Sequence, residues 1–138
     1  MKYKTEKDEA SGLLRIISLI DIPKWDVVAG CKGGLLEKES NLSHEGACWV
    51  SGDAWVLGDA QVSLTSHLIT IGPIGSRGAA LTMFRTEKGA SVATGCFLGT
   101  LEEFEAAVCK KPEGDIHRLV YESQISTFKL ISKNYHKV

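Results

Sequence analysis

The chain has 138 residues, enough for one hydrophobic core or for two very small modules that support each other. Its 16 Lys and Arg against 17 Asp and Glu leave a net charge of -1, so bulk charge does not favour duplex nucleic acid or an anionic membrane. No stretch approaches the roughly 20 apolar residues that span a bilayer, and residues 1–10 lack the apolar segment of a signal peptide. We therefore expect a cytoplasmic protein with no membrane partner.

The N-terminal part of the chain divides into two predicted segments. Residues 1–11 are charged and without periodicity, which predicts a flexible arm. Residues 13–22 are rich in β-branched side chains and stop at Pro23, which predicts a strand followed by a turn.

A six-residue repeat follows in GACWVSGDAWVLGDAQVSLTSHL, where an aliphatic residue, a small residue and glycine recur in phase. This period is typical of a parallel β-helix, in which each hexad forms one short face and then turns a corner. We therefore predict a short parallel β-helix coil within residues 12–67. Trp55 should point outward, and the aliphatic positions should point inward: Val50, Val56, Val62 and Leu68.

Four hexads form little more than one coil, whereas a solenoid needs about three repeats before stacking buries a continuous core. Neighbouring elements or a second copy must therefore cover the coil. An uncovered end would expose strand edges and apolar side chains, so we expect a homo-oligomer.

From Leu68 onward the pattern changes to short apolar alternations separated by turns that contain glycine or proline. These segments predict a three-stranded antiparallel sheet with a hairpin at Thr86–Gly89. Thr100 and Glu103 form a Thr-x-x-Glu capping box, which predicts the start of a helix. A second helix is expected to begin near Asp115, with these residues on its buried face: Ile116, Leu119, Val120 and Ser123.

These elements predict an α+β protein in which a short parallel β-helix segment precedes a small antiparallel sheet with two C-terminal helices. The expected boundaries are a flexible arm over 1–11, the N-terminal strand and hexapeptide coil over 12–67, and the sheet with two helices over 68–138.

Two stretches carry a resemblance to known proteins. The segment GGLLEKESNLSHEGACWVSGDAWV resembles the entry cap of hexapeptide-repeat arrays in proteins of phages, prophages and gut bacteria. The GSR, GCF and GTLEEF motifs, with a sheet before two helices, are similar to phage sponge proteins of the Thoeris anti-defence family. That resemblance implies stoichiometric sequestration of a cyclic ADP-ribose-like or cyclic oligonucleotide immune signal. One departure is Gly78-Ala79-Ala80, which follows GSR where the family has polar residues.

The best candidate for an anion site is the segment IGPIGSRGAAL. Its glycines let backbone N–H groups approach a ligand, and Arg77 supplies a two-pronged guanidinium. Alternatively, Arg77 is an ordinary turn residue. This hypothesis assigns ligand binding to Gly75, Ser76, Arg77 and, in the following strand, Arg85.

Three further residues are candidates for the same site. Phe97 precedes the helix at Thr100 and could stack on a base, although a phenylalanine at such a position is more often part of the core. His117 and Arg118 open the second helix and would complete a phosphate or ribose site if that helix end faces Arg77.

The sequence favours a binding protein over an enzyme. It contains no Ser-His-Asp order and no phosphate-binding Gly-x-x-x-x-Gly-Lys loop, so we predict neither catalytic residues nor a cofactor. The four cysteines form no Cys-x-x-Cys pair, which argues against a metal site. Two other classes remain open: an assembly protein without a small ligand, and a hexapeptide acyltransferase that would use His44 or His67 as its base.

Overall fold

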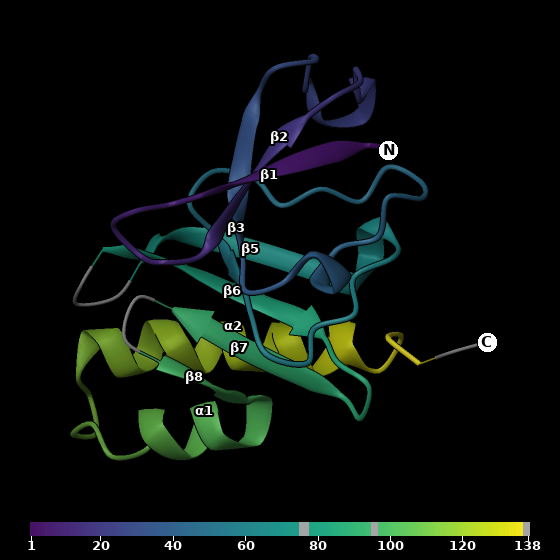
Figure 1. Cartoon of the computed structure of the whole chain (residues 1–138). Helices are drawn as coiled ribbons and strands as arrows, with labels where there is room; N and C mark the ends of the chain where they lie inside the picture. Colours follow the sequence, from purple (N-terminus) through teal and green to yellow (C-terminus); the bar gives the residue numbers. More distant parts are fainter. Residues whose placement is uncertain (75–77, 95–96, 137–138) are drawn as a thin grey trace.

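The computed structural model describes residues 1–74, 78–94 and 97–136. It is an α+β fold with two four-stranded sheets and two helices (Figure 1). The strands are β1 (Tyr3–Lys7), β2 (Leu14–Ser18), β3 (Lys32–Leu36), β4 (Trp55–Val56), β5 (Leu68–Ile74), β6 (Ala79–Arg85), β7 (Ala90–Thr94) and β8 (Phe97–Thr100). The helices are α1 (Leu101–Val108) and α2 (Ile116–Ser132), with short 3-10 turns at Pro23–Trp25, Glu39–Asn41 and Thr65–His67.

The first sheet has the strand order β1-β2-β3-β4 and includes the segment that was expected to be a flexible arm. That expectation is wrong for residues 3–7, because β1 pairs antiparallel with β2 along its whole length. Tyr3 is fully buried and Lys2 is 2% exposed. Contacts with residues 39–48 hold both side chains, so the charged segment is ordered by parts of the chain far away in sequence.

The predicted parallel β-helix is wrong, because the described residues form flat sheets and no β-helix. Parallel pairing in the hexad region is limited to β3 with β4 and to a single bridge between Leu42 and Val62. The β2–β3 pairing beside them is antiparallel. The first sheet is therefore mixed, and the hexads cover it as connected turns rather than as stacked coils.

The hexad period correctly predicts three of its four inward positions, and the fourth, Leu68, is only partly buried. Val50, Val56 and Val62 are at most 1% exposed and belong to the core of the N-terminal half. Gly46, Gly52 and Gly58 have φ values of 67°, 59° and 60°, a left-handed conformation that glycine adopts without strain. The three repeats with these glycines thus each contribute a left-handed turn and a buried valine.

The second sheet has the order β5-β6-β7-β8 with every neighbouring pair antiparallel, and so contains one strand more than was predicted. The hairpin expected at Thr86–Gly89 is present, with the Thr86 N–H donating to the Gly89 carbonyl at 3.0 Å. Helix α1 begins at the predicted capping box, because Thr100 Oγ1 accepts from the Glu103 N–H at 3.1 Å.

Helix α2 begins where the sequence predicts it, after Asp115, whose carboxylate accepts from the N–H groups of His117 and Arg118. Its predicted buried face is wrong. Ile116 and Leu119 are 64% and 51% exposed, whereas Ile125 and Phe128 are buried. The helix packs on the sheet through the side that carries Phe128, so the side with Ile116 and Leu119 faces away from the core.

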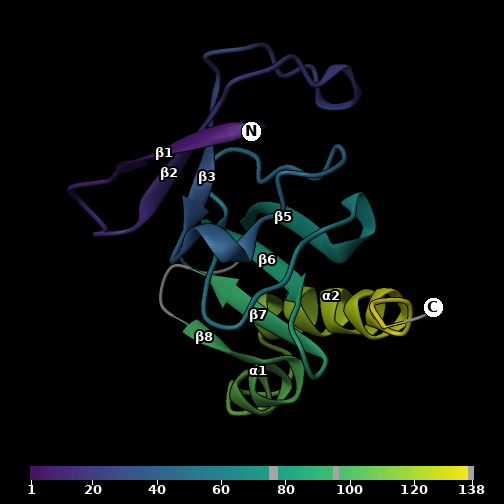
Figure 2. The same ribbon diagram turned by 45° about the vertical axis from the view of Figure 1, so that its right-hand side comes forward.

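The second sheet lies between two layers, with the N-terminal sheet and hexad turns on one face and both helices on the other (Figures 1 and 2). Leu81, Met83 and Val92 pack against the helices. Phe84 and Ala93, which point to the opposite face, belong to the core around the hexads. Both hydrophobic cores therefore meet at this one sheet.

Candidate functional site

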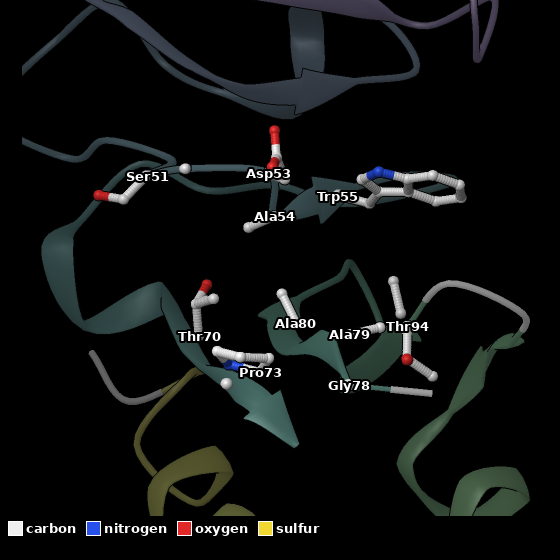
Figure 3. Close-up of a pocket in the computed structure, with 13 residues that line it drawn as sticks. Ser51, Asp53, Ala54, Trp55, Thr70, Pro73, Gly78, Ala79, Ala80 and Thr94 are labelled. Atoms are coloured by element: carbon white, nitrogen blue, oxygen red, sulfur yellow. The ribbon is translucent and has the colours of Figure 1, made fainter. Parts of the chain in front are cut away.

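A cleft of about 600 Å³ separates the hexad turn at Ser51–Trp55 from the adjoining face of the second sheet. Figure 3 shows Ala54 on the hexad wall, with Thr70 and Ala80 rising toward it from β5 and β6. Elsewhere this interface is filled by Phe84 and the hexad valines. The cleft is therefore the part of the interface that side chains leave open.

The cleft is open because its walls carry small side chains. Glycine or alanine occupies seven of the lining positions, and the largest side chain is that of Trp55. Ser51, Thr70 and Thr94 contribute hydroxyl groups to the lining. The lining residues are Ser51, Gly52, Asp53, Ala54, Trp55, Thr70, Gly72, Pro73, Gly78, Ala79, Ala80, Ala93 and Thr94.

Among the described residues of the cleft, Asp53 carries the charge. Its carboxylate is directed away from Thr70 and Ala80 (Figure 3) and lies 3.5 Å from Arg15 Nη1. The same Arg15 nitrogen donates to the Gly33 carbonyl at 2.8 Å, so β2 and β3 fix the position of the guanidinium. The cleft wall itself is apolar and hydroxyl-rich, which suits a neutral, flat ring better than an isolated charge.

Three of the predicted ligand residues, Gly75, Ser76 and Arg77, lie outside the described residues. Gly78, which follows them in sequence, lines the cleft. Their assignment to a ligand site stays a prediction.

Arg85 lies at the far end of β6 and away from the cleft. Its Nε donates to the Tyr135 carbonyl at 2.8 Å, and its Nη1 donates to the Gln61 carbonyl at 3.2 Å. These bonds join β6 to the end of the chain and to the hexads. The guanidinium therefore has a structural role in this fold.

The other three predicted ligand residues also lie outside the cleft lining. The Phe97 ring packs on Phe104 of α1, with the ring centroids 5.4 Å apart, as the core interpretation of Phe97 proposed. Arg118 Nη1 donates to the Lys111 carbonyl at 2.8 Å, and its Nε lies 3.5 Å from Glu122. His117 adjoins Arg118 in the first turn of α2. The structure does not gather these side chains at one place.

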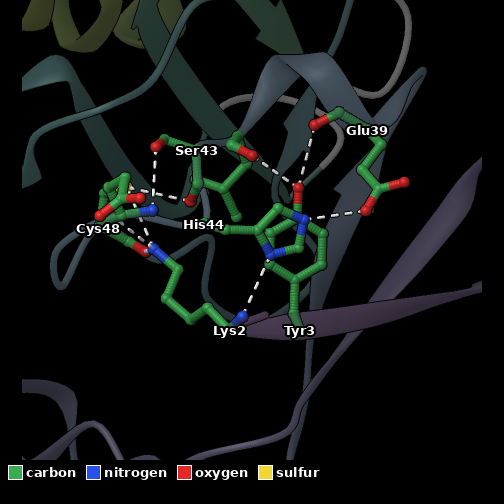
Figure 4. A network of polar contacts seen from close by, with 8 residues as sticks. Lys2, Tyr3, Glu39, Ser43, His44 and Cys48 are labelled. Atoms are coloured by element: carbon green, nitrogen blue, oxygen red, sulfur yellow. Dashed lines mark hydrogen bonds and ion pairs between the residues drawn. The ribbon is translucent and has the colours of Figure 1, made fainter.

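His44 belongs to a polar network at the N-terminus, shown in Figure 4. Its Nδ1 accepts from the Lys2 N–H at 3.1 Å, so the ring proton is on Nε2 and donates to Glu39 at 2.8 Å. The ring stacks on Tyr3 with a centroid distance of 4.0 Å. Since both nitrogens have partners, His44 serves to fix β1 against residues 39–48.

His67 holds the turn before β5. Its Nδ1 accepts from the N–H groups of Ser63 and Leu64, each at 3.1 Å, and the residue is 6% exposed. Burial lowers the pKa of His67, and the nearby positive groups Arg85 and His136 lower it further. The folded protein therefore keeps this imidazole neutral.

This arrangement predicts a loss of stability in mild acid. In the unfolded chain His67 binds a proton below about pH 6.5, whereas the folded form resists protonation because its pKa is lower. Stability should therefore fall as the pH drops from about 6.5 toward the folded-state pKa. Melting temperatures at pH 7.5 and 5.5 measure the effect, and His67→Asn, whose amide oxygen accepts without titrating, should show a smaller drop. An equal drop in both proteins would contradict this assignment.

Sequence reasoning missed the cleft because small residues form no chemical motif. Ala54 was predicted only as one of the small residues that recur in the hexads, and Trp55 only as an outward residue. The run Gly78-Ala79-Ala80 was noted as a departure from the family pattern, and in the structure it forms part of the cleft wall. This run of three small residues was the sequence signal that could have indicated the cleft.

Comparisons with protein-family models, with curated proteins and with solved structures find no match for this chain. Within the described ranges, no helix has the length and apolar character needed to cross a bilayer. The same ranges contain no group of three or more His, Cys, Asp or Glu side chains arranged to hold a metal ion.

Proposed function

We propose that this protein is a non-catalytic binding protein that sequesters a nucleotide-derived immune signal, of the cyclic ADP-ribose-like or cyclic oligonucleotide class, as phage anti-defence proteins do. The observation that supports the proposal is the cleft between the hexads and the second sheet. It is large enough for a base with its ribose, because small-molecule sites are typically 300 to 1,000 Å³. Such a protein would act in the host cytoplasm.

The chemistry of the wall matches the parts of such a ligand. Ala54, Ala80 and Pro73 provide an apolar surface for a base, and Trp55 offers an indole edge beside it. The hydroxyls of Thr70 and Thr94 can exchange hydrogen bonds with a ribose. In this proposal the phosphates are bound by Arg77, a role predicted from the sequence.

The test fills the cleft and measures ligand binding. Ala80→Leu places a larger side chain in the opening, so nucleotide affinity should fall at least tenfold while the melting temperature stays the same or rises. Ala106→Leu, at an exposed position of α1, is the matched control and should bind as the wild type does. The readout is the thermal shift of each protein with cyclic ADP-ribose isomers, ADP-ribose and cyclic dinucleotides.

Saturation of the site stabilises the protein by about 2.7 kcal/mol at a hundredfold ligand excess over Kd, which a thermal melt resolves easily. Absence of a shift across the whole panel would refute nucleotide binding. A shift that Ala80→Leu leaves unchanged would place the ligand elsewhere on the protein.

A further inference from the structure

The outward face of α2 is apolar, and no other element of the described residues covers it. Ile116, Leu119 and Leu130 are 64%, 51% and 66% exposed, which makes them three of the most exposed large hydrophobic residues in the described chain. Ser123 and Ser126 lie between them on the same side of the helix. Together these five residues form a stripe that we call the α2 stripe.

The α2 stripe has the spacing of a helix-pairing seam. Its members follow one another at intervals of three, four, three and four residues, the a and d pattern by which two helices pack along their length. Positions 120 and 127, beside the stripe, are Val and Thr, so this face carries no charge between Ile116 and Leu130, and the next position at the same spacing is Lys133 at the helix C-cap. A surface helix in a chain with 24% charged residues would ordinarily expose Lys and Glu there.

We propose that the α2 stripe binds the same stripe of a second copy of this chain, with the two helices antiparallel about a twofold axis. When the axis passes between positions 124 and 125, Leu119 faces the partner's Leu130 twice, once on each side of the axis. Ser123 then faces the partner's Ser126 at the centre, where small side chains let the two helices approach closely. The stripe from Leu119 to Leu130 is thus self-complementary, as a twofold interface requires, whereas Ile116 faces the partner's Lys133 at the end of the helix.

Charges along one border of the α2 stripe agree with this register. Glu122 and Lys129 occupy the flanking position next to the seam, and antiparallel pairing brings Glu122 near the partner's Lys129. Within the chain, Glu122 lies 3.5 Å from Arg118, and Lys129 lies 2.6 Å from Glu105 of α1. In the dimer these two ion pairs would lie next to each other across the interface, with charges of opposite sign as neighbours.

A second copy explains the stripe better than an unrelated partner, because register, small central residues and border charges all match under one symmetry operation. The 17 residues of α2 span about 25 Å, so the pair buries less area than a standard interface of about 1,600 Å². We therefore expect a concentration-dependent dimer with a Kd on the order of micromolar.

The test is molar mass by sedimentation equilibrium between about 1 and 200 µM. The wild type should approach 30 kDa, twice the 15.0 kDa of the chain, at the upper end of this range. Leu119→Glu should remain near 15 kDa throughout, because it places two carboxylates against apolar side chains of the partner. Leu64→Glu, at a leucine of similar exposure away from α2, should dimerise as the wild type does.

A double variant tests the register. Leu119→Glu combined with Leu130→Lys in the same chain places each new carboxylate opposite a new ammonium of the partner, and dimerisation should return. A wild type that is monomeric at 200 µM would overturn the proposal and leave the stripe to a different partner. A dimer that survives Leu119→Glu would place the interface elsewhere. Neither result bears on the cleft, since none of these residues lines it.

Discussion

Replacing Val56 with aspartate is expected to remove most of the stability of this protein. Val56 is completely buried in the core around the hexads, among side chains that offer a carboxylate no partner. An unpaired buried charge costs about 4 kcal/mol, a large share of the stability of a domain this size. The melting temperature should fall by about 15 °C, or the folded state should be lost, as followed by circular dichroism.

Trp55→Ser is the matched control, because Trp55 adjoins Val56 but is half-buried at the edge of the cleft. Its loss should cost clearly less than the Val56 change. If the Trp55 variant melts at the lower temperature, the inward and outward positions of the hexads have been assigned in the wrong phase.

Gly34→Ala is expected to cost about 3 kcal/mol, an unusually large effect for the addition of one methyl group. A Cβ at Gly34 would lie 2.6 Å from the Ala54 carbonyl oxygen and would also clash with the Val50 side chain. At this point β3 runs directly beneath the hexad backbone, with the Gly34 N–H donating to the Val50 carbonyl at 2.7 Å. Neither backbone can move without breaking the contact between the two.

Gly89→Ala serves as the control for Gly34→Ala, because no atom lies within 4 Å of the added Cβ and the residue has no left-handed backbone conformation. It should melt within about 2 °C of the wild type. Urea denaturation of the two variants measures the difference. A Gly34→Ala protein as stable as the control would mean that β3 and the hexads are less closely packed than described.

Features set by neighbouring residues were predictable. The capping box at Thr100 and Glu103 is a local signal, because both hydrogen bonds close within one turn, and the helix begins there. The hexad period likewise assigns Val50, Val56 and Val62 to the core. The prediction of a β-helix from the same period was wrong. The repeat determines where each hexad turns, but it does not determine which strand each hexad packs against.

Long-range contacts decide the elements that sequence reasoning misplaced. Residues 1–11 are mostly polar, yet Tyr3 is buried, with its ring stacked on His44 and its hydroxyl donating to the Glu39 carbonyl at 2.9 Å. Helix α2 has apolar residues on two sides, and sequence alone does not show which side meets the sheet. Phe128 does so, which leaves Ile116 and Leu119 outside. The cleft was unpredictable for a similar reason, since Ala54 and Ala80 meet only after both halves have folded.

The position of Phe84 and Ala93 makes the chain indivisible as a folding unit. Their strands supply Met83 and Val92 to the helical core and, on alternate residues, Phe84 and Ala93 to the core around the hexads. If the chain were divided before Leu68, the ring of Phe84 in the C-terminal fragment would be exposed to water. The hexad valines in the N-terminal fragment would lose the sheet face against which they pack. Exchange of the segment after Leu68 with that of a related chain should therefore give a folded protein only where the new sheet has side chains equivalent to Phe84 and Ala93.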